Sequence, residues 1–229
     1  FNSDSQKLEY FNGEIWMQIH TFSPDLNGGA RGITAGGVAP SNTHNTINYI
    51  TIATSGNGVD FGDLSYNQYL SSGTSSRTRG VFMGGYTNSP SSTYINSIQC
   101  LEISSKGSAS DFGDLTQTAG YTGSCGNQTR GIRMGGTGPS NPGTNTMDYV
   151  TIATKANAVD YGDMGHGSDN QGQINSPIRG ITATNSNSYK QMEFMTIPTT
   201  GNSTDFGTLS YGRENGGGMS NSVRGIFLG

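Results

Sequence analysis

Apolar residues in this chain fall in short runs separated by stretches rich in Gly, Ser, Thr and Asn. Within the runs apolar and polar positions tend to alternate, as in Tyr49-Ile50-Thr51-Ile52. Alternation with a period of two, bounded by turn residues, is the pattern of β-strands. The sequence therefore predicts an all-β protein built from many short strands.

Two motifs alternate along the chain and define an internal repeat. An Arg-Gly dipeptide opens an apolar run at intervals of 45 to 51 residues, at Arg31, Arg79, Arg130, Arg179 and Arg224. An Asp-aromatic-Gly tripeptide lies between consecutive dipeptides, at Asp60, Asp111, Asp160 and Asp205. A period of this length holds one four-stranded unit and matches no helical repeat. We therefore expect a single domain over residues 1–229, folded as a five-bladed β-propeller.

Each repeat predicts its strands in the same order. Arg-Gly strands are expected at 32–35, 80–83, 131–134, 180–183 and 225–228, with the Gly-Gly pairs at Gly36, Gly84 and Gly135 marking strand ends. A polar loop leads to strands at 47–53, 98–104, 147–153 and 192–197, and short strands surround Phe61, Phe112, Tyr161 and Phe206. The stretch before the next Arg-Gly has room for a fourth strand.

The two ends of the chain each carry half of a repeat. Residues 1–20 contain Leu8-Glu9-Tyr10-Phe11, which is similar to Ile47-Asn48-Tyr49-Ile50, and Trp16 is placed in the recurring aromatic position. Residues 210–229 end on an Arg-Gly strand with nothing after it. We expect the two halves to pair and close the ring, which protects sheet edges. Trp16 and the four tripeptide aromatics should then be buried between neighbouring sheets.

One half of the repeat is constant in length and the other varies. The spacing from each tripeptide Asp to the next Arg is always 19 residues, whereas the spacing from Arg to the following Asp ranges from 26 to 32. The variation falls in the loops 38–46, 86–97, 137–146 and 185–191, and repeat proteins commonly bind partners through such loops. The side chains there that could stack on or hydrogen-bond a sugar are His44, Tyr86, Tyr94, Tyr189 and Lys190. Solvated loops have the same composition, so that alternative stays open.

The recurring Arg and Asp residues favour a structural role over a set of ligand sites. A residue needed for packing recurs in every blade, whereas a catalytic residue is usually needed once. An Arg can donate to strand-end carbonyls, and an Asp can accept backbone amides in the turn before the aromatic.

Composition excludes several partners. The net charge is −4, with 12 Lys plus Arg and no basic block, so neither nucleic acid nor an anionic membrane surface is expected as a partner. No apolar stretch approaches the length of a spanning helix, and we expect no membrane insertion. Cys100 and Cys125 have no counterparts in other repeats, which favours buried, reduced thiols over a disulfide.

No arrangement of residues points to catalysis, a metal or a cofactor. Asp63, Asp114 and Asp163 form no compact calcium loop, and His20, His44 and His166 lie at different repeat positions. A hydrolase would need a convergent acid pair, for which Asp25, Glu102, Asp169 and Glu214 are candidates without a pairing signal. We therefore expect a protein that is not an enzyme.

The Gly-Gly after an apolar strand and the two aromatic positions that follow it resemble the kelch repeat over nearly the whole chain, with Phe or Tyr where kelch has Trp, except at Trp16. Three motifs look like those of tandem propeller repeats in bacteriophage virion proteins. They are Arg-Gly-Val-Phe-Met-Gly-Gly at 79–85, Ile-Asn-Tyr-Ile-Thr-Ile-Ala-Thr at 47–54 and Asp-Phe-Gly-Asp-Leu at 60–64. The opening segment 1–16 is similar to a hairpin of phage tail-fibre proteins.

The resemblance implies an extracellular virion protein, of tail-fibre or capsid-decoration type. Its expected partners are other virion proteins and a host-surface glycan, and homo-oligomerisation stays open. The alternative is a secreted or surface lectin with sugar sites repeated around the ring.

Overall fold

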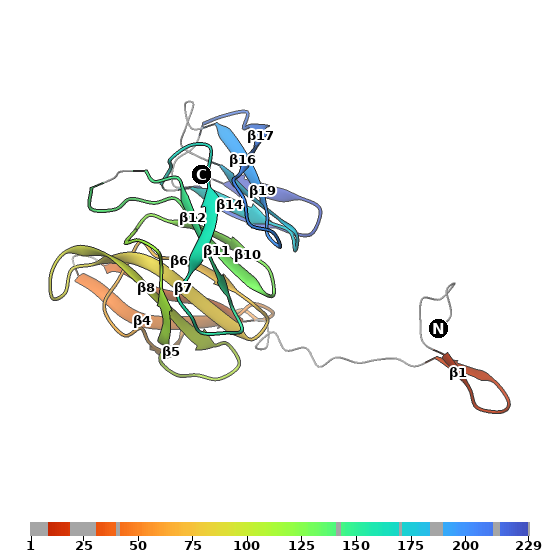
Figure 1. Ribbon diagram of the computed structural model, residues 1–229. Coiled ribbons are helices and arrows are strands. Elements are labelled where there is room, and N and C mark those ends of the chain that lie inside the picture. The colour runs from red at the N-terminus through yellow and green to blue at the C-terminus, as the bar shows by residue number, and fades with distance from the viewer. Residues whose placement is uncertain are drawn as a thin grey trace.

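The protein is all-β. The computed structural model describes residues 9–18, 31–39, 42–140, 143–169, 171–183, 190–212 and 216–228. In these ranges 19 strands form six small antiparallel sheets, with no helix and hence none that could cross a membrane (Figure 1). The expected fold class is confirmed at this level.

Three of the sheets have four strands each and share one topology. We call these sheets units 2, 3 and 4. Unit 2 consists of β6 (Ser72–Ser75), β7 (Arg79–Thr87), β8 (Thr93–Glu102) and β9 (Ser110–Asp114). Unit 3 consists of β10 (Gly123–Gly126), β11 (Arg130–Met134), β12 (Thr146–Thr151) and β13 (Val159–Asp163). Unit 4 consists of β14 (Gly172–Asn175), β15 (Arg179–Ala183), β16 (Gln191–Thr196) and β17 (Thr204–Thr208). The strands of a unit pair in chain order, so each unit has a first, second, third and fourth strand position.

The remaining sheets are partial copies of this unit. Unit 1 consists of β3 (Arg31–Ala39), β4 (Asn42–Thr51) and β5 (Val59–Asp63), in the second to fourth positions. β18 (Gly217–Ser220) and β19 (Gly225–Leu228) occupy the first and second positions of a fifth copy, the C-terminal half-unit. The N-terminal hairpin consists of β1 (Glu9–Phe11) and β2 (Trp16–Gln18).

Successive units contact each other in chain order through their first strands, β6 with β10, β10 with β14 and β14 with β18. The expected strand before the Arg-Gly dipeptide exists in the four repeats of Arg79, Arg130, Arg179 and Arg224, and it pairs with the Arg-Gly strand that follows it. These four units therefore begin one strand earlier than the Arg-Gly motif, whereas the residues directly before Arg31 lie outside the described ranges.

The Gly-Gly pairs do not end the strands in units 1 and 2, contrary to expectation. The register between β7 and β8 shifts between Met83 and Gly85, and pairing then continues to Thr87 and Thr93. Gly84 and Gly85 take φ angles of +63° and +124°, which lets the strand bulge and continue. Unit 3 follows the expectation, because β11 ends at Met134, directly before its Gly-Gly pair.

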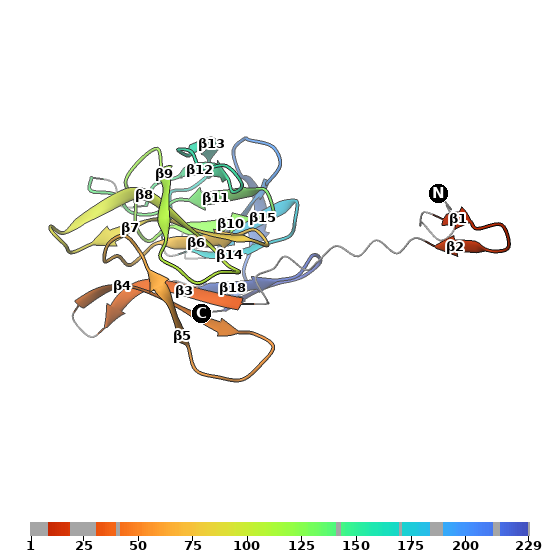
Figure 2. The ribbon, with the colours of Figure 1, turned by 90° about the horizontal axis from the view of Figure 1, so that it is seen from below.

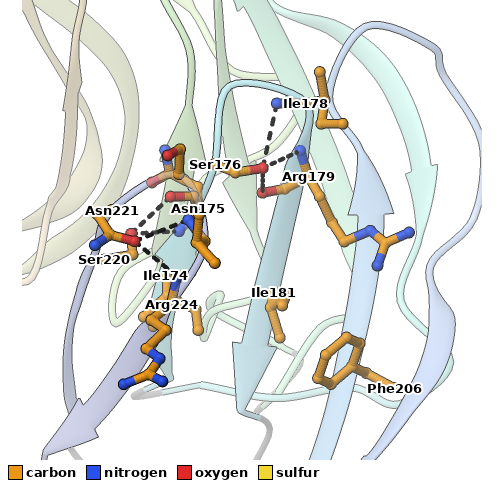
Figure 3. Close-up of a pocket in the computed structure, with 13 residues that line it drawn as sticks. Ile174, Asn175, Ser176, Ile178, Arg179, Ile181, Phe206, Ser220, Asn221 and Arg224 are labelled. Atoms are coloured by element: carbon orange, nitrogen blue, oxygen red, sulfur yellow. Dashed lines mark hydrogen bonds between the residues drawn. The ribbon is translucent and has the colours of Figure 1, made fainter.

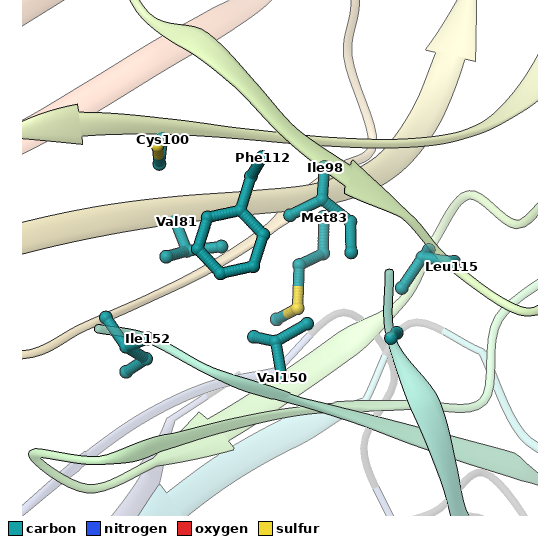
Figure 4. Packing of buried hydrophobic residues seen from close by; sticks show 9 residues of the cluster. Val81, Met83, Ile98, Cys100, Phe112, Leu115, Val150 and Ile152 are labelled. Carbon is teal, nitrogen blue, oxygen red and sulfur yellow. The ribbon is translucent and has the colours of Figure 1, made fainter. Parts of the chain in front are cut away.

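The hydrophobic core consists of separate clusters, each spanning the boundary between two units. In the cluster of Figure 4, Phe112 of β9 packs with Val81 and Met83 of its own unit and with Val150 and Ile152 of unit 3. Corresponding clusters join Phe61 to Leu101 and Ile103, and Tyr161 to Met195 and Ile197. The fourth-position aromatic of one unit is thus covered by the third-strand segment of the next.

Closure of the ring is not shown. The hairpin pairs with itself, and Figures 1 and 2 show it standing clear of the other sheets. Trp16 is 69 % exposed and Phe206 45 % exposed, so the expected burial holds for Phe61, Phe112 and Tyr161 and is wrong for these two. Phe206 is exposed because, within the described residues, no third strand pairs with β19 to cover it.

The placement of Trp16 in the aromatic position is also wrong. Met17 lies opposite Tyr10, as Val59 lies opposite Tyr49 in unit 1. Counting from these pairs, the position equivalent to Phe61 falls two residues after Met17, on Ile19, which lies outside the described residues. The turn between β1 and β2 is shorter than the connection between β4 and β5, so Trp16 lies in β2 before the position equivalent to Phe61.

Both cysteines are buried free thiols, as expected. Cys100 belongs to the cluster around Phe112, and Cys125 to the cluster around Tyr161. Burial raises the pKa of Cys125 to about 12, which keeps it protonated and unreactive.

We predict that Phe112→Ala destabilises the fold by about 3–5 kcal/mol, the usual cost of deleting a buried aromatic side chain. Urea unfolding followed by circular dichroism measures the loss. Val159→Ala is the matched control, since Val159 is 54 % exposed on β13. Equal midpoints for the two variants would contradict the boundary-core assignment.

Candidate functional site

Three aromatic side chains gather where the far end of the long hairpin of β7 and β8 meets the segment between β5 and β6, and we call them the tyrosine cluster (Tyr69, Tyr86 and Tyr94). Tyr86 and Tyr94 lie opposite each other on the two strands, with ring centroids 4.9 Å apart and planes at 78°. Tyr69 meets Tyr86 at 5.5 Å and 74°. These are edge-to-face contacts between half-buried rings, a geometry favoured by the aromatic quadrupole.

Local backbone structure positions the cluster. The bulge at Gly85 carries β7 past its usual end and presents Tyr86 to the segment after β5. There Tyr69 and Tyr86 exchange two backbone hydrogen bonds, of 3.0 and 2.7 Å. The next residue, Leu70, takes a φ of +61°, a left-handed conformation that is uncommon outside Gly and turns the chain away.

Two hydroxyl groups of the cluster, those of Tyr69 and Tyr94, have raised pKa values. Burial raises the pKa of Tyr69, with further contributions from Tyr86 and Tyr121. Burial likewise raises the pKa of Tyr94, and Tyr121 and Asp169 are among the groups that add to it. Neutral phenols beside aromatic faces can hydrogen-bond and stack on a sugar ring, whereas they supply no base for catalysis.

The other expected ligand residues do not join the cluster as a group. His44 is exposed on β4, with its Nε2 atom 3.0 Å from the Ala39 carbonyl oxygen. Its backbone carbonyl accepts a bond from Gln68, the residue before Tyr69, so His44 lies in the neighbouring strand segment. Lys190 belongs to unit 4, where its carbonyl accepts a bond from the Leu209 amide. Tyr189 lies outside the described residues.

The recurring arginines tie each unit to the next. Arg31, Arg79 and Arg130 donate from Nη1 to the carbonyls of Ile103, Ile152 and Ile197 at 2.7, 2.9 and 3.2 Å. Three guanidinium groups also lie over the aromatic ring of their own third strand: Arg31 over Tyr49, Arg130 over Tyr149 and Arg179 over Phe194. Their place in the structure is the unit boundary. The tripeptide Asp residues are exposed.

A second recurring tie was missed by the sequence analysis. The third strand carries a polar residue that bonds to the loop of the preceding unit in three units: Gln99 accepts from the Ser65 amide, Asp148 from the Thr116 hydroxyl and Glu193 from the Gly165 amide. In unit 3 Asp148 also forms a fully buried ion pair with Arg133. The signal was available, because Asn48, Gln99, Asp148 and Glu193 stand at one position of the repeat between apolar neighbours.

The carboxylates considered for hydrolysis are occupied elsewhere. Glu102 pairs with Arg79 at 2.8 Å, and Asp169 accepts a hydrogen bond from the Thr137 hydroxyl at 2.8 Å. Glu193, a carboxylate outside that set of candidates, lies with Oε1 2.7 Å from Nδ1 of His166. Asp25 and Glu214 lie outside the described residues. Within the described ranges no three His, Cys, Asp or Glu side chains gather in a way that could hold a metal.

No protein-family model matches the chain, and no curated protein matches it either.

We predict that Arg130→Lys destabilises the protein by about 1–2 kcal/mol, because an ammonium group cannot both cover the Tyr149 ring and reach the Ile197 carbonyl. Arg77→Lys is the control, since Arg77 is exposed and opens no strand. Thermal unfolding of the two variants compares them. Identical transitions would remove the structural role assigned to the recurring Arg.

We predict that stability falls as the pH rises from about 10 to about 12. Burial raises the pKa of Tyr161 to about 12, and its hydroxyl donates to the Thr196 carbonyl at 2.7 Å. The unfolded chain loses this proton near pH 10, so the contribution is complete below that pH and is lost as the pH approaches 12. Unfolding midpoints over this range should fall less steeply in Tyr161→Phe. Parallel curves for the two proteins would contradict the assignment.

Proposed function

We propose that this chain is a non-enzymatic surface module of a bacteriophage virion, of tail-fibre or capsid-decoration type, that presents its strand-end hairpins to a host-surface glycan. The resemblance of its repeat wording and opening hairpin to phage virion proteins supports the virion assignment. Other virion proteins are its expected partners for attachment. The proposal includes a five-bladed ring in which the N-terminal hairpin and β18–β19 share one blade.

The division of each unit into constant and variable parts supports a presenting role. Unit boundaries repeat the same apolar and arginine contacts, whereas the hairpin between the second and third strands differs in length and content. A rigid scaffold with variable hairpins can change its binding surface at little cost to the core.

The observation that carries the glycan assignment is the tyrosine cluster. The cluster offers three half-buried rings with their hydroxyl groups, where the far end of the hairpin of β7 and β8 meets the segment between β5 and β6. Its residues are not repeated, since Thr137 of unit 3 and Val38 of unit 1 stand seven residues after their Arg, where Tyr86 stands in unit 2. One binding site per chain is therefore expected, whereas the alternative, a lectin, calls for several.

We predict that the chain binds immobilised bacterial lipopolysaccharide or capsular polysaccharide with one site per chain, and that Tyr94→Ala weakens binding at least tenfold. Tyr211→Ala is the control, because Tyr211 is 75 % exposed and lies in the loop after unit 4. Surface plasmon resonance gives affinity and stoichiometry. Unchanged affinity in Tyr94→Ala would refute the cluster as the site, several equivalent sites would favour the lectin, and no binding would leave only docking to virion proteins.

A further inference from the structure

An apolar groove lies between unit 4 and the C-terminal half-unit. It is a cavity of about 390 Å³ lined by Ile174, Ile178, Ile181, Phe206 and Val223, together with the turns around Ser176 and Asn221. Figure 3 shows Ile181 and Phe206 on one side and Ser220, Asn221 and Arg224 on the other. Ile178, Phe206 and Val223 are all substantially exposed.

At the three earlier boundaries the aromatic is covered, and the cavity between units 1 and 2 is smaller, about 200 Å³. There the third strand of the following unit places two apolar residues against the aromatic, as Val150 and Ile152 do against Phe112. Within the described residues only β18 and β19 pair in the C-terminal half-unit, so no strand there covers Phe206 in this way. The groove is therefore shaped for an extended segment that pairs with β19.

Polar groups around the groove lack the partners that their counterparts have. The guanidinium groups of Arg31, Arg79 and Arg130 each donate to a carbonyl of the next third-strand segment, whereas no carbonyl in the described ranges accepts a bond from that of Arg179. A methyl group added at Gly113 would meet the Ala156 carbonyl at 2.5 Å, whereas one added at Gly207 would meet nothing within 4 Å. The boundary is thus built for a neighbouring strand and turn.

We propose that the N-terminal hairpin of the same chain occupies this groove, with β1 paired to β19 in the third position and β2 in the fourth. This inference rests on the proposed five-bladed ring and adds the strand order and register of its closure. Two strands complete the half-unit to four, the number in units 2 to 4. The segment Leu8-Glu9-Tyr10-Phe11 matches Met192-Glu193-Phe194-Met195 of unit 4 in type at every position. Phe11, now 52 % exposed, then covers Phe206, as Met195 covers Tyr161.

The match extends to the polar ties. Glu9 stands where Glu193 accepts from the Gly165 amide, so it meets the amide of Ser210 in the loop after unit 4. Tyr10 stands where Phe194 lies under Arg179, so it lies under Arg224. Gly13 replaces the Ile197 position, and its carbonyl is the acceptor for Arg179.

The opposite end of the array is open in a complementary way. Ile50 and Ile52 of unit 1 are 48 % and 66 % exposed, whereas their counterparts Val150 and Ile152 are buried. Docked at β19, the hairpin lies between Phe206 and this face, and Arg224 is placed to donate to the Ile52 carbonyl as Arg79 donates to that of Ile152.

A cysteine pair tests the docking and its register. In unit 4 Ile181 lies opposite Phe194, so Ile226 is expected opposite Tyr10. Cys100 already occupies the Tyr10 position in unit 2, which indicates that the fold tolerates Tyr10→Cys. The full chain carrying Tyr10→Cys and Ile226→Cys should form an intramolecular disulfide on mild oxidation, seen by peptide mass spectrometry and as a monomer in light scattering.

The matched control is Tyr10→Cys with Phe227→Cys, which differs by one residue and places the two thiols on opposite faces of the sheet. It should stay reduced. Disulfide-linked dimers would show that the groove takes the hairpin of a second copy, and no cross-link in either pair would show that it takes another segment; both results would overturn the proposal.

Hydrogen exchange on the chain with its native cysteines gives an independent test. Phe11→Asp places a charge in the groove and should release the hairpin, so the amides of 225–228 should exchange at least tenfold faster than in the parent. Ile15→Asp in the hairpin turn should leave them unchanged. Equal exchange in the Phe11→Asp variant and the parent would also overturn the docking.

Discussion

The contact between the aromatic of one unit and the third-strand segment of the next is the interaction on which the rest of the structure depends. A single sheet of four short strands cannot bury its own aromatic side chain, because a sheet needs a second layer packed on its face to form a core. The next unit supplies two apolar residues, such as Val150 and Ile152 around Phe112. Stability is therefore shared between neighbours, as in other repeat proteins.

Two polar interactions accompany this apolar contact and fix its geometry. The recurring Arg reaches the carbonyl that ends the neighbouring third-strand segment, and a polar residue of that strand holds the loop of the preceding unit. Both need the same spacing in every unit, which explains why the distance from the tripeptide to the next Arg is constant. The hairpins beyond the Gly-Gly pairs take no part in these two interactions and are free to differ in length.

At the two ends of the array, side chains that are buried at the boundaries between units are exposed. Within the described residues no third strand follows Phe206 and no aromatic packs on Ile50 and Ile52, and all three side chains are exposed while their counterparts are buried. The N-terminal hairpin carries, in Phe11, the apolar residue type that covers the aromatic at the earlier boundaries. The proposed ring completion and the proposed presentation of the hairpins are separate, because the tyrosine cluster lies where units 1 and 2 meet and at neither end.

The sequence by itself determined the strands, the repeat and the boundary core, because alternation and the spacing of Arg and Asp are local properties of the chain. It also indicated Tyr86 and Tyr94 as residues of a variable hairpin. Only the tertiary structure decided that Tyr69 joins them, since that contact depends on a bulge at Gly85 and a bridge between distant segments. It likewise decided the exposure of Trp16 and Phe206, because burial at a boundary depends on the neighbour and not on the residue itself.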